Sequence, residues 1–343
     1  MAEQAGYRVR EWGQDPQWES FPIPSPGSHE VLVQVEACGV GLTVLNCIDG
    51  NLGNDPGLLP RVPGHELVGR VVEIGAGADP GLEGRRVVAY FYLSCGHCEW
   101  CRAGREQRCA NLAGQIGVHR DGGYAPWVVL PELNAVPVSD ELDPVAATVV
   151  PDAVATPVHV ADRADITPAD RVAVVGAGGG VGIHMVQVAR HRGAAVAGLD
   201  VTEEKLAEIE RLGALAVRSD DFEGLEHGIF EGERPTVVVD LLGTTETAAW
   251  ALDALGMGGR LVALTTFPGR EAAFSARDMV FREMSILGSR YSHRAQVVEA
   301  ARLVAEGHVE AIIGSVAGPQ EVLGLHEQIR SQRLIGRGAL DWR

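Results

Sequence analysis

Short apolar runs alternate with amphipathic segments through the second half of the chain. Residues 172–175 form a continuous apolar run, as is typical of a strand buried in a parallel sheet, and residues 194–200 form a second run that ends at Asp200. The same pattern predicts further strands at 235–243, 260–266 and 284–291, and a helix at 244–259. Strands that alternate with helices in this way predict an α/β fold with a doubly wound parallel sheet.

The first half of the chain has a different pattern. Its apolar runs are short and are separated by glycine turns, without long amphipathic segments between them. The runs with this character are residues 30–39, 67–75, 84–93 and 125–132. A β-rich domain is therefore expected beside the parallel-sheet domain.

Composition narrows the class of protein. The 343 residues are 46% hydrophobic and 22% charged, which predicts a soluble globular protein with two domains. The net charge is −17 and no run of Lys or Arg interrupts it, which argues against a nucleic-acid partner and against an anionic membrane surface. We see no signal peptide and no apolar run of the roughly 18 residues that a membrane span needs, so we expect a cytoplasmic protein.

Four of the six cysteines lie in one short segment, "CGHCEWCRAGREQRC". Their spacing is C-x2-C-x2-C-x7-C, and in a reducing compartment such clustering favours a metal over disulfides. Four thiolates close a tetrahedron around Zn²⁺ and leave no position for a substrate, so the segment predicts a structural zinc site. An iron–sulfur cluster also takes four thiolates, but no other feature of the chain supports one. The four predicted ligands are Cys95, Cys98, Cys101 and Cys109.

A glycine-rich turn joins the strand at 172–175 to the following helix. Glycine lets the backbone approach a pyrophosphate, and the start of the helix stabilises its negative charge. Asp200 ends the second strand, 18 residues after Gly182, where its carboxylate can accept both hydroxyls of an adenine ribose. It would repel a 2′-phosphate, so NAD is favoured over NADP. The predicted contacts of the turn are Gly176, Gly178, Gly179, Gly180, Val181 and Gly182.

A zinc-type cysteine loop ahead of an NAD fold, with "GHELVG" upstream, resembles the zinc-containing alcohol dehydrogenases of the medium-chain dehydrogenase/reductase family. The likeness covers nearly the whole chain, including "GVHRDGGYAPWVVLP" and the closing "LIGRGALDWR". It implies a GroES-like catalytic domain, residues 1–152 and 291–343 with the zinc loop at 95–109, and an inserted Rossmann domain, residues 153–290. It also implies a homodimer or homotetramer and hydride transfer between NAD and an alcohol or carbonyl carbon.

The resemblance also implies a catalytic zinc ion that polarises the substrate oxygen. His65 matches the family's histidine ligand, Glu66 the neighbouring carboxylate, and Asp152 a third ligand that is Cys, Glu or Asp in the family. Without the family context, His65 reads equally well as a buried histidine with satisfied hydrogen bonds, and Asp152 as a helix cap.

The sequence departs from the family at the first ligand. Where the family reads "CGVCxTD", this chain reads "CGVGLTV". Gly41 stands in place of the ligating cysteine, Val44 in place of the aspartate that supports the histidine ligand, and Asn46 in place of a proton-relay histidine. Thr43 remains, and its hydroxyl can hydrogen-bond the substrate oxygen and pass a proton.

Three interpretations of this site remain open. Zinc could be held by His65, Glu66 and Asp152 alone, since one nitrogen and two oxygens bind Zn²⁺ acceptably. Cys38 or Cys47 could substitute for the missing thiolate, although a small buried hydrophobic role is preferred for both. The third interpretation is a site without zinc, which would rely on Thr43 and its pocket.

Two further residues are implied near the cofactor. Arg337, in "GRGAL", matches an arginine that the family brings to the cofactor pyrophosphate, and a surface arginine is the alternative. Lys205 follows Asp200 and could approach the ribose, or it could lie on a solvated helix face.

The sequence thus predicts an NAD-dependent oxidoreductase acting on a small alcohol or carbonyl substrate. A zinc-free reductase of an activated C=C bond or carbonyl on the same fold is the alternative. A non-enzymatic NAD-binding scaffold or sensor is the second alternative, and the retained "GHE", Asp152 and Thr43 argue against it.

Overall fold

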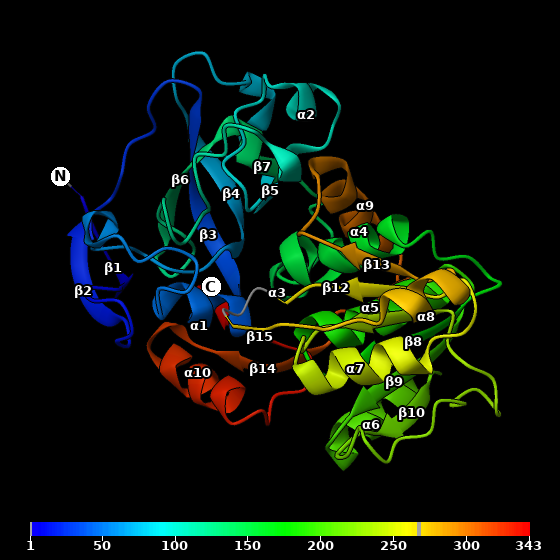
Figure 1. The fold of residues 1–343 in the computed structure, drawn as a ribbon. Helices are drawn as coiled ribbons and strands as arrows, with labels where there is room; N and C mark the ends of the chain where they lie inside the picture. The colour runs from blue at the N-terminus through cyan, green and yellow to red at the C-terminus, as the bar shows by residue number, and fades with distance from the viewer. Residues whose placement is uncertain (1, 266–268) are drawn as a thin grey trace. The chain divides into compact units, whose positions relative to one another are not determined.

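Strands from both ends of the chain combine in the first of two structural units (Figure 1). The computed structural model describes residues 2–265 and 269–343. Unit 1 comprises Met1–Ala155, Ser292–Gly307 and Ala311–Arg343, and unit 2 comprises Thr156–Tyr291 and His308–Glu310.

Unit 1 is built on a seven-stranded sheet. Strands β14 and β15, drawn toward the red end of the colour scale in Figure 1, continue the sheet beyond the blue strand β3. The order is β14-β15-β3-β4-β5-β7, and β6 also pairs with β3. The strands are β3 (Glu30–Val40), β4 (Glu66–Ile74), β5 (Arg86–Ala89), β6 (Trp127–Pro131), β7 (Ala135–Pro137), β14 (Ile313–Ala317) and β15 (Arg337–Asp341), and β1 (Glu3–Arg8) forms a separate hairpin sheet with β2 (Gln17–Pro22).

Short helices fill the connections of unit 1. A π-helical turn, Val150–Val154, precedes α4 and carries Asp152; such turns are rare and occur often at functional sites. The helices are α1 (Leu42–Ile48), α2 (Glu99–Arg102), α3 (Pro144–Ala147), α9 (Arg294–Ala305) and α10 (Val322–Arg330), while α4 (Ala155–Arg163) begins at the boundary with unit 2.

Unit 2 contains the predicted parallel sheet. Its six strands pair in parallel in the order β10-β9-β8-β11-β12-β13, so the first strand in sequence, β8, lies at the centre and the order reverses beside it. In such sheets a ligand binds at the carboxyl ends of the strands at this reversal. The strands are β8 (Arg171–Val175), β9 (Ala195–Asp200), β10 (Leu215–Arg218), β11 (Val237–Asp240), β12 (Arg260–Ala263) and β13 (Ser285–Gly288), and the remaining helices are α5 (Gly180–His191), α6 (Glu203–Arg211), α7 (Thr245–Ala254) and α8 (Ala276–Phe281).

The core of unit 2 explains why apolar runs form its strands. Both faces of the central strands are covered, so β8 and β11 bury successive residues instead of alternating ones. Ala173, Val175, Leu199 and Val238 pack with Trp250 of α7 in one apolar cluster.

The predicted elements match the structure in type and differ at their ends. The strand predicted at 84–93 is limited to β5, because Tyr90 N turns to bond Asn134 O and Leu93 N bonds Gly114 O. The helix predicted at 244–259 ends at Ala254, where Leu255 adopts an extended backbone. The predicted strand 260–266 corresponds to β12, and its last residue, Thr266, lies outside the described residues. Among the described residues, no helix has the length and apolar character that crossing a membrane requires.

Candidate active site

The four cysteines of the 95–109 loop converge on one point. Their ligand atoms all lie within 4.8 Å of one another, and the sulfurs of Cys98 and Cys101 are 3.5 Å apart. Cys95 and Cys101 are separated by 3.9 Å, as are Cys98 and Cys109. A tetrahedral zinc with Zn–S bonds of about 2.3 Å places its sulfurs about 3.8 Å apart, so these separations fit a zinc shell. All four thiols are free of disulfides.

Backbone amides point at these sulfurs, as a thiolate site requires. The N–H of Cys98 donates to Cys95 Sγ at 3.3 Å, and the N–H of Cys95 donates to Cys109 Sγ at 3.3 Å. The N–H of His97, followed by that of Cys98, lowers the pKa of Cys95 to about 6. His97 Nδ1 lies 2.7 Å from the carbonyl oxygen of Cys95, so this ring nitrogen is engaged by the backbone and not by the four sulfurs.

In unit 2, the glycine turn lies between β8 and α5 at the carboxyl end of the sheet. Gly176 has a φ of 78°, which favours glycine, and a Cβ on Gly182 would lie 2.2 Å from the carbonyl oxygen of Gly176. The turn therefore needs glycine for both conformation and space. Helix α5 begins at Gly180 and runs for 12 residues, long enough for its N-terminus to favour a phosphate.

Asp200 lies at the end of β9 beside this turn. Its Oδ2 accepts from the N–H of Gly178 at 2.8 Å, and its Oδ1 accepts from the N–H of Val201 at 2.8 Å. Lys205 Nζ lies 3.5 Å from Oδ1, and both side chains are largely buried. The structure thus brings Asp200, Lys205 and the glycine turn together, as a ribose-binding carboxylate requires.

In unit 1, strand register places Gly41, Glu66 and Arg337 side by side. Gly338 pairs with Val40 between β15 and β3, and Gly39 pairs with Glu66 between β3 and β4. Arg337 is the first residue of β15 and faces the end of β3. Residues far apart in sequence therefore meet at one end of three adjacent strands.

Arg337 forms a buried ion-pair network with the two predicted carboxylate ligands. Its Nε donates to both oxygens of Glu66 at 3.1 and 2.9 Å, and its Nη2 donates to Glu66 Oε1 at 2.9 Å and to Asp152 Oδ2 at 3.0 Å. Burial alone would lower the pKa of Arg337, but the charges of Glu66 and Asp152 outweigh it and raise that pKa. The guanidinium is thus a fixed positive charge at this site.

His65 belongs to the same cluster but lacks a support. Its Nε2 lies 3.5 Å from Asp152 Oδ2, and its ring packs on Phe91 with centroids 4.4 Å apart. Its Nδ1 is buried and has no hydrogen-bond partner in the part of the chain that the structure describes. The sequence explains this, because Val44 stands where the resemblance implies a supporting aspartate and offers no acceptor.

As arranged, these residues do not form a metal shell. Among the described residues, the four loop cysteines are the one set of three or more His, Cys, Asp or Glu side chains whose ligand atoms converge. The guanidinium of Arg337 holds the carboxylates of Glu66 and Asp152, and both oxygens of Glu66 are already engaged. His65, Glu66 and Asp152 therefore lie together around a guanidinium instead of around a common ligand point.

The two other cysteines belong to no converging set of possible metal ligands among the described residues. Cys38 and Cys47 are buried, with exposed fractions of 0% and 1%. Burial, followed by the charge of Glu66, raises the pKa of Cys38 well above its usual value, and burial with the charge of Asp152 raises the pKa of Cys47. Both thiols are thus disfavoured as thiolates and serve as small packing residues.

Thr43 lies in the first turn of α1 and is half-buried. Thr43 follows Gly41 by two residues, and Gly41 lies against Arg337, so Thr43 is close along the chain to the cluster of Arg337, Glu66 and Asp152. Asn46 is buried, and its Oδ1 accepts from Asn51 at 3.4 Å, so this side chain has a local structural partner.

The sequence analysis missed the pairing of Arg337 with Glu66 and Asp152. The signal available was a missing thiolate beside two retained carboxylates.

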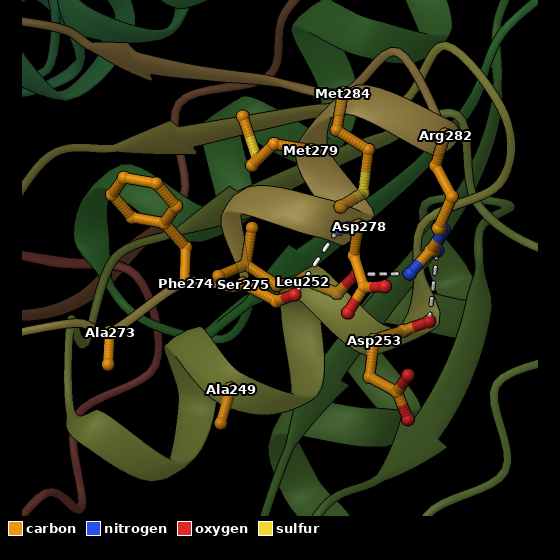
Figure 2. Close-up of a pocket in the computed structure, with 10 residues that line it drawn as sticks. All are labelled: Ala249, Leu252, Asp253, Ala273, Phe274, Ser275, Asp278, Met279, Arg282 and Met284. Atoms are coloured by element: carbon orange, nitrogen blue, oxygen red, sulfur yellow. Dashed lines mark hydrogen bonds between the residues drawn. The ribbon is translucent and has the colours of Figure 1, made fainter.

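A shallow hollow of about 200 Å³ lies in unit 2 and contains none of the predicted site residues. Figure 2 shows Arg282 donating to the carbonyls of Leu252 and Asp253, while Ser275 accepts from the N–H of Asp278. Phe274, at its margin, is 60% exposed. The hollow is lined by the α7 and α8 region, which the predicted chemistry does not use.

Comparison with known proteins identifies the family. Residues 27–140 match the model of the alcohol dehydrogenase GroES-like domain, and residues 180–306 match that of the zinc-binding dehydrogenases. With the relatives described next, these matches show that the chain belongs to the zinc-type medium-chain alcohol dehydrogenase family. The predicted fold class, a GroES-like domain with a Rossmann parallel-sheet domain, is confirmed.

Several relatives match across most of the chain. L-galactonate-5-dehydrogenase of Escherichia coli is 31% identical over 298 residues, covering 86% of this chain and 85% of the relative. An alcohol dehydrogenase of a Moraxella species is 32% identical over 340 residues, covering 97% and 98%. The structure of a thermostable alcohol dehydrogenase from Pyrobaculum aerophilum has a TM-score of 0.90 at 29% identity, covering 99% and 100%.

The chain is therefore an enzyme, an oxidoreductase that acts on small alcohol or carbonyl compounds. NAD and zinc are, in general terms, the cofactors of its family. The predicted enzyme class is thus confirmed, and the alternative of a non-enzymatic scaffold is not supported.

Proposed function

We propose that this enzyme transfers hydride between NAD and a small alcohol or carbonyl compound, and that it prefers NAD to NADP. Asp200 carries the proposal: a buried carboxylate at the end of β9, bonded to the N–H of Gly178 in the glycine turn. Such a carboxylate accepts hydroxyls of the adenine ribose and repels a 2′-phosphate. In the proposed reaction, the Thr43 hydroxyl transfers the proton to or from the substrate oxygen.

The same proposal assigns a structural zinc ion to the cysteine loop. The sulfur separations of 3.5 to 3.9 Å and the N–H groups aimed at the sulfurs support it. A closed shell of four thiolates has no open position for substrate, so this ion stabilises the loop and takes no part in hydride transfer. Reduced thiols at this density also support a reducing compartment, and we place the enzyme in the cytoplasm.

We further propose a homodimer or homotetramer. Strand β13 is the edge of the six-stranded sheet, and Ile286 on it is 40% exposed. Val280 and Phe281 of α8 are 72% and 65% exposed. An unpaired edge strand with exposed apolar side chains nearby favours pairing with another copy of the chain.

The experiment is a turnover panel on the purified protein. Secondary alcohols with NAD⁺ or NADP⁺, and ketones, aldehydes and activated C=C compounds with NADH or NADPH, are followed at the absorbance of the reduced nicotinamide. We expect turnover of an alcohol or carbonyl pair, with kcat/KM higher for NAD(H) than for NADP(H). Turnover of activated C=C compounds alone, or a preference for NADPH, would contradict the proposal.

A further inference from the structure

We propose that the guanidinium of Arg337 is the fixed cation of the active site, in place of a catalytic zinc ion, and that its Nη1 donates to the substrate oxygen. This inference rests on the proposed hydride transfer and names the group that polarises the substrate. It makes the catalytic site metal-free, while the cysteine loop keeps its zinc.

The first support is the space beside Gly41. A Cβ at this position would lie 2.2 Å from Arg337 Nη1, 2.4 Å from Cζ and 2.8 Å from Nε. The backbone of Gly41 is extended, with φ −140° and ψ −178°, which any residue adopts. Glycine is therefore required here by the guanidinium and not by the backbone. A ligating cysteine and this position of Arg337 exclude each other.

The second support is charge. Glu66 and Asp152 are both buried, and like charges this close are costly without a compensating cation. Arg337 supplies that cation with a fork of two donor nitrogens that matches the carboxylates. A residue of the chain itself thus balances one of the two negative charges that a metal would otherwise balance.

The third support is the distribution of donors on the guanidinium. Nε and Nη2 make all of the hydrogen bonds to Glu66 and Asp152. Among the described residues Nη1 makes none of these bonds, and it is the guanidinium atom nearest to where a Cβ on Gly41 would lie. The two N–H groups of Nη1 are thus left to bind a ligand, while Nε and Nη2 hold the guanidinium in place.

The chemical step follows from this placement. In the reductive direction, NADH gives a hydride with its two electrons to the carbonyl carbon and becomes NAD⁺. The electron pair of the C=O π bond moves to oxygen, and the N–H groups of Arg337 Nη1 stabilise the developing alkoxide. The alkoxide then takes a proton from the Thr43 hydroxyl, which solvent restores. Oxidation of the alcohol is the same sequence in reverse.

Metal content tests the inference without depending on turnover. The protein is purified, dialysed against zinc buffer and then metal-free buffer, and its zinc per chain is measured beside a Cys101→Ser variant. We expect one equivalent in the native chain and its loss in the variant. A second equivalent, or an equivalent that survives Cys101→Ser, would overturn the inference. Absence of turnover would instead contradict the proposed function, so the two failures are distinguishable.

Two glycine variants form a matched pair. Gly41→Ala adds one methyl group against the guanidinium, whereas Gly324→Ala on α10 adds one in open space. We expect Gly41→Ala to lower kcat about 100-fold, as loss of an oxyanion donor does, with the Kd of NAD within twofold of native. Gly324→Ala should match the native enzyme. An unchanged kcat in Gly41→Ala would contradict the role of Arg337.

Chemical rescue separates catalysis from structural support. Arg337→Ala is assayed with millimolar guanidinium chloride and with the same concentration of sodium chloride, and the Kd of NAD is measured by fluorescence. We expect turnover to fall at least 100-fold, to recover at least tenfold with guanidinium alone, and to leave the Kd of NAD within threefold of native. No rescue in a folded variant, or an NAD Kd raised tenfold or more, would instead assign Arg337 to the cofactor pyrophosphate.

Discussion

Under the proposed function, Asp200 serves both the protein and the cofactor. Each of its oxygens already accepts a backbone N–H, from Gly178 and from Val201. A carboxylate oxygen has two lone pairs, so both oxygens can still accept a ribose hydroxyl. Lys205 Nζ, 3.5 Å from Oδ1, partly balances the charge of this buried carboxylate.

Asp200→Ala should raise the Kd of NAD about 10- to 100-fold, because hydrogen bonds to a charged group contribute about 1.5–3 kcal/mol. The Kd of NADP should change little, because the substitution also removes the repulsion of its 2′-phosphate. Binding of the reduced cofactors, NADH and NADPH, is measured by the fluorescence of their nicotinamide rings. Asp170→Asn, a buried aspartate at the opposite end of the sheet beside β8, is the control and should preserve the preference.

If the unmodified protein binds NADP better than NAD, the assignment of Asp200 to the ribose is wrong. Equal losses for both cofactors in Asp200→Ala would point to a collapse of the glycine turn, since Gly178 also loses its acceptor.

At the residue scale, the sequence predicts the sites whose members lie close along the chain. The four cysteines span 15 positions, and Asp200 follows the glycine turn at a spacing that βαβ geometry imposes. Arg337 could not be placed in this way. Its contact with Glu66 spans 271 residues and depends on the register of β15 against β3, which no local pattern specifies.

Helix α10 illustrates an element held by a buried polar pair. His326, on its inner face, has its Nε2 3.0 Å from the hydroxyl of Tyr124, and the rings stack. Burial, followed by the charge of Arg330, lowers the pKa of His326 from its ordinary 6.5 to about 4, while Asp15 acts in the opposite direction. The folded protein thus keeps this histidine neutral.

This pair should make unit 1 sensitive to acid. Between pH 6.5 and about 4 the unfolded chain binds a proton at His326 and the folded chain does not, so stability falls as the pH falls. The loss approaches about 3 kcal/mol at the lower pH. His326→Gln retains an acceptor for Tyr124 and does not titrate, so its Tm should fall less over this range.

Thermal unfolding of both proteins at several pH values checks the prediction. His119→Gln is a useful comparison, because burial also lowers the pKa of His119, but that histidine lies outside α10. Parallel Tm curves for the native protein and His326→Gln would show that the Tyr124–His326 pair is not the acid-sensitive contact.

At the element scale, apolar runs located β3 to β6 of unit 1 and five of the six parallel strands of unit 2, but they predicted none of β7, β10, β14 and β15. One further error occurs where an apolar run leaves the sheet. Residues 90–93 are as apolar as β5 itself, but their amides bond loop carbonyls. The first hairpin, β1 with β2, was missed because "EQAGYR" and "QWESFP" show no apolar run. Its strands are held by pairing and by packing of Tyr7 on Trp18, which composition does not reveal.

At the scale of the whole molecule, the two edges of the parallel sheet differ. Near the β13 edge, Val280, Phe281 and Ile286 are exposed. At the opposite edge, β10 exposes Leu215 but ends at Arg218, which pairs with Glu203 and Asp220. Charged edge strands resist pairing, so the β13 edge is the better candidate for contact with a second copy.

Replacing both Val280 and Ile286 with Asp should dissociate the proposed oligomer. Each large apolar side chain contributes about 1.5–3 kcal/mol when it is fully buried, and an unpaired carboxylate in the same place is costly. Sedimentation velocity should show a dimer or tetramer for the native enzyme and a monomer for the double variant. Leu215→Asp is the matched control at the other edge and should retain the native assembly. If Leu215→Asp alone dissociated the oligomer, the interface would lie at the β10 edge instead.

The position of β15 in the chain has a consequence for synthesis. Glu66 emerges from the ribosome 271 residues before Arg337, and Asp152 emerges 185 residues before it. Throughout that interval the two carboxylates lack the guanidinium of Arg337, and β3 has no β15 beside it. Unit 2 is nearly contiguous in sequence and is complete in the nascent chain well before then. Unit 2, which is proposed to bind the nucleotide, can therefore fold during translation, whereas the sheet of unit 1, with the proposed reacting groups, is complete only when β15 is released.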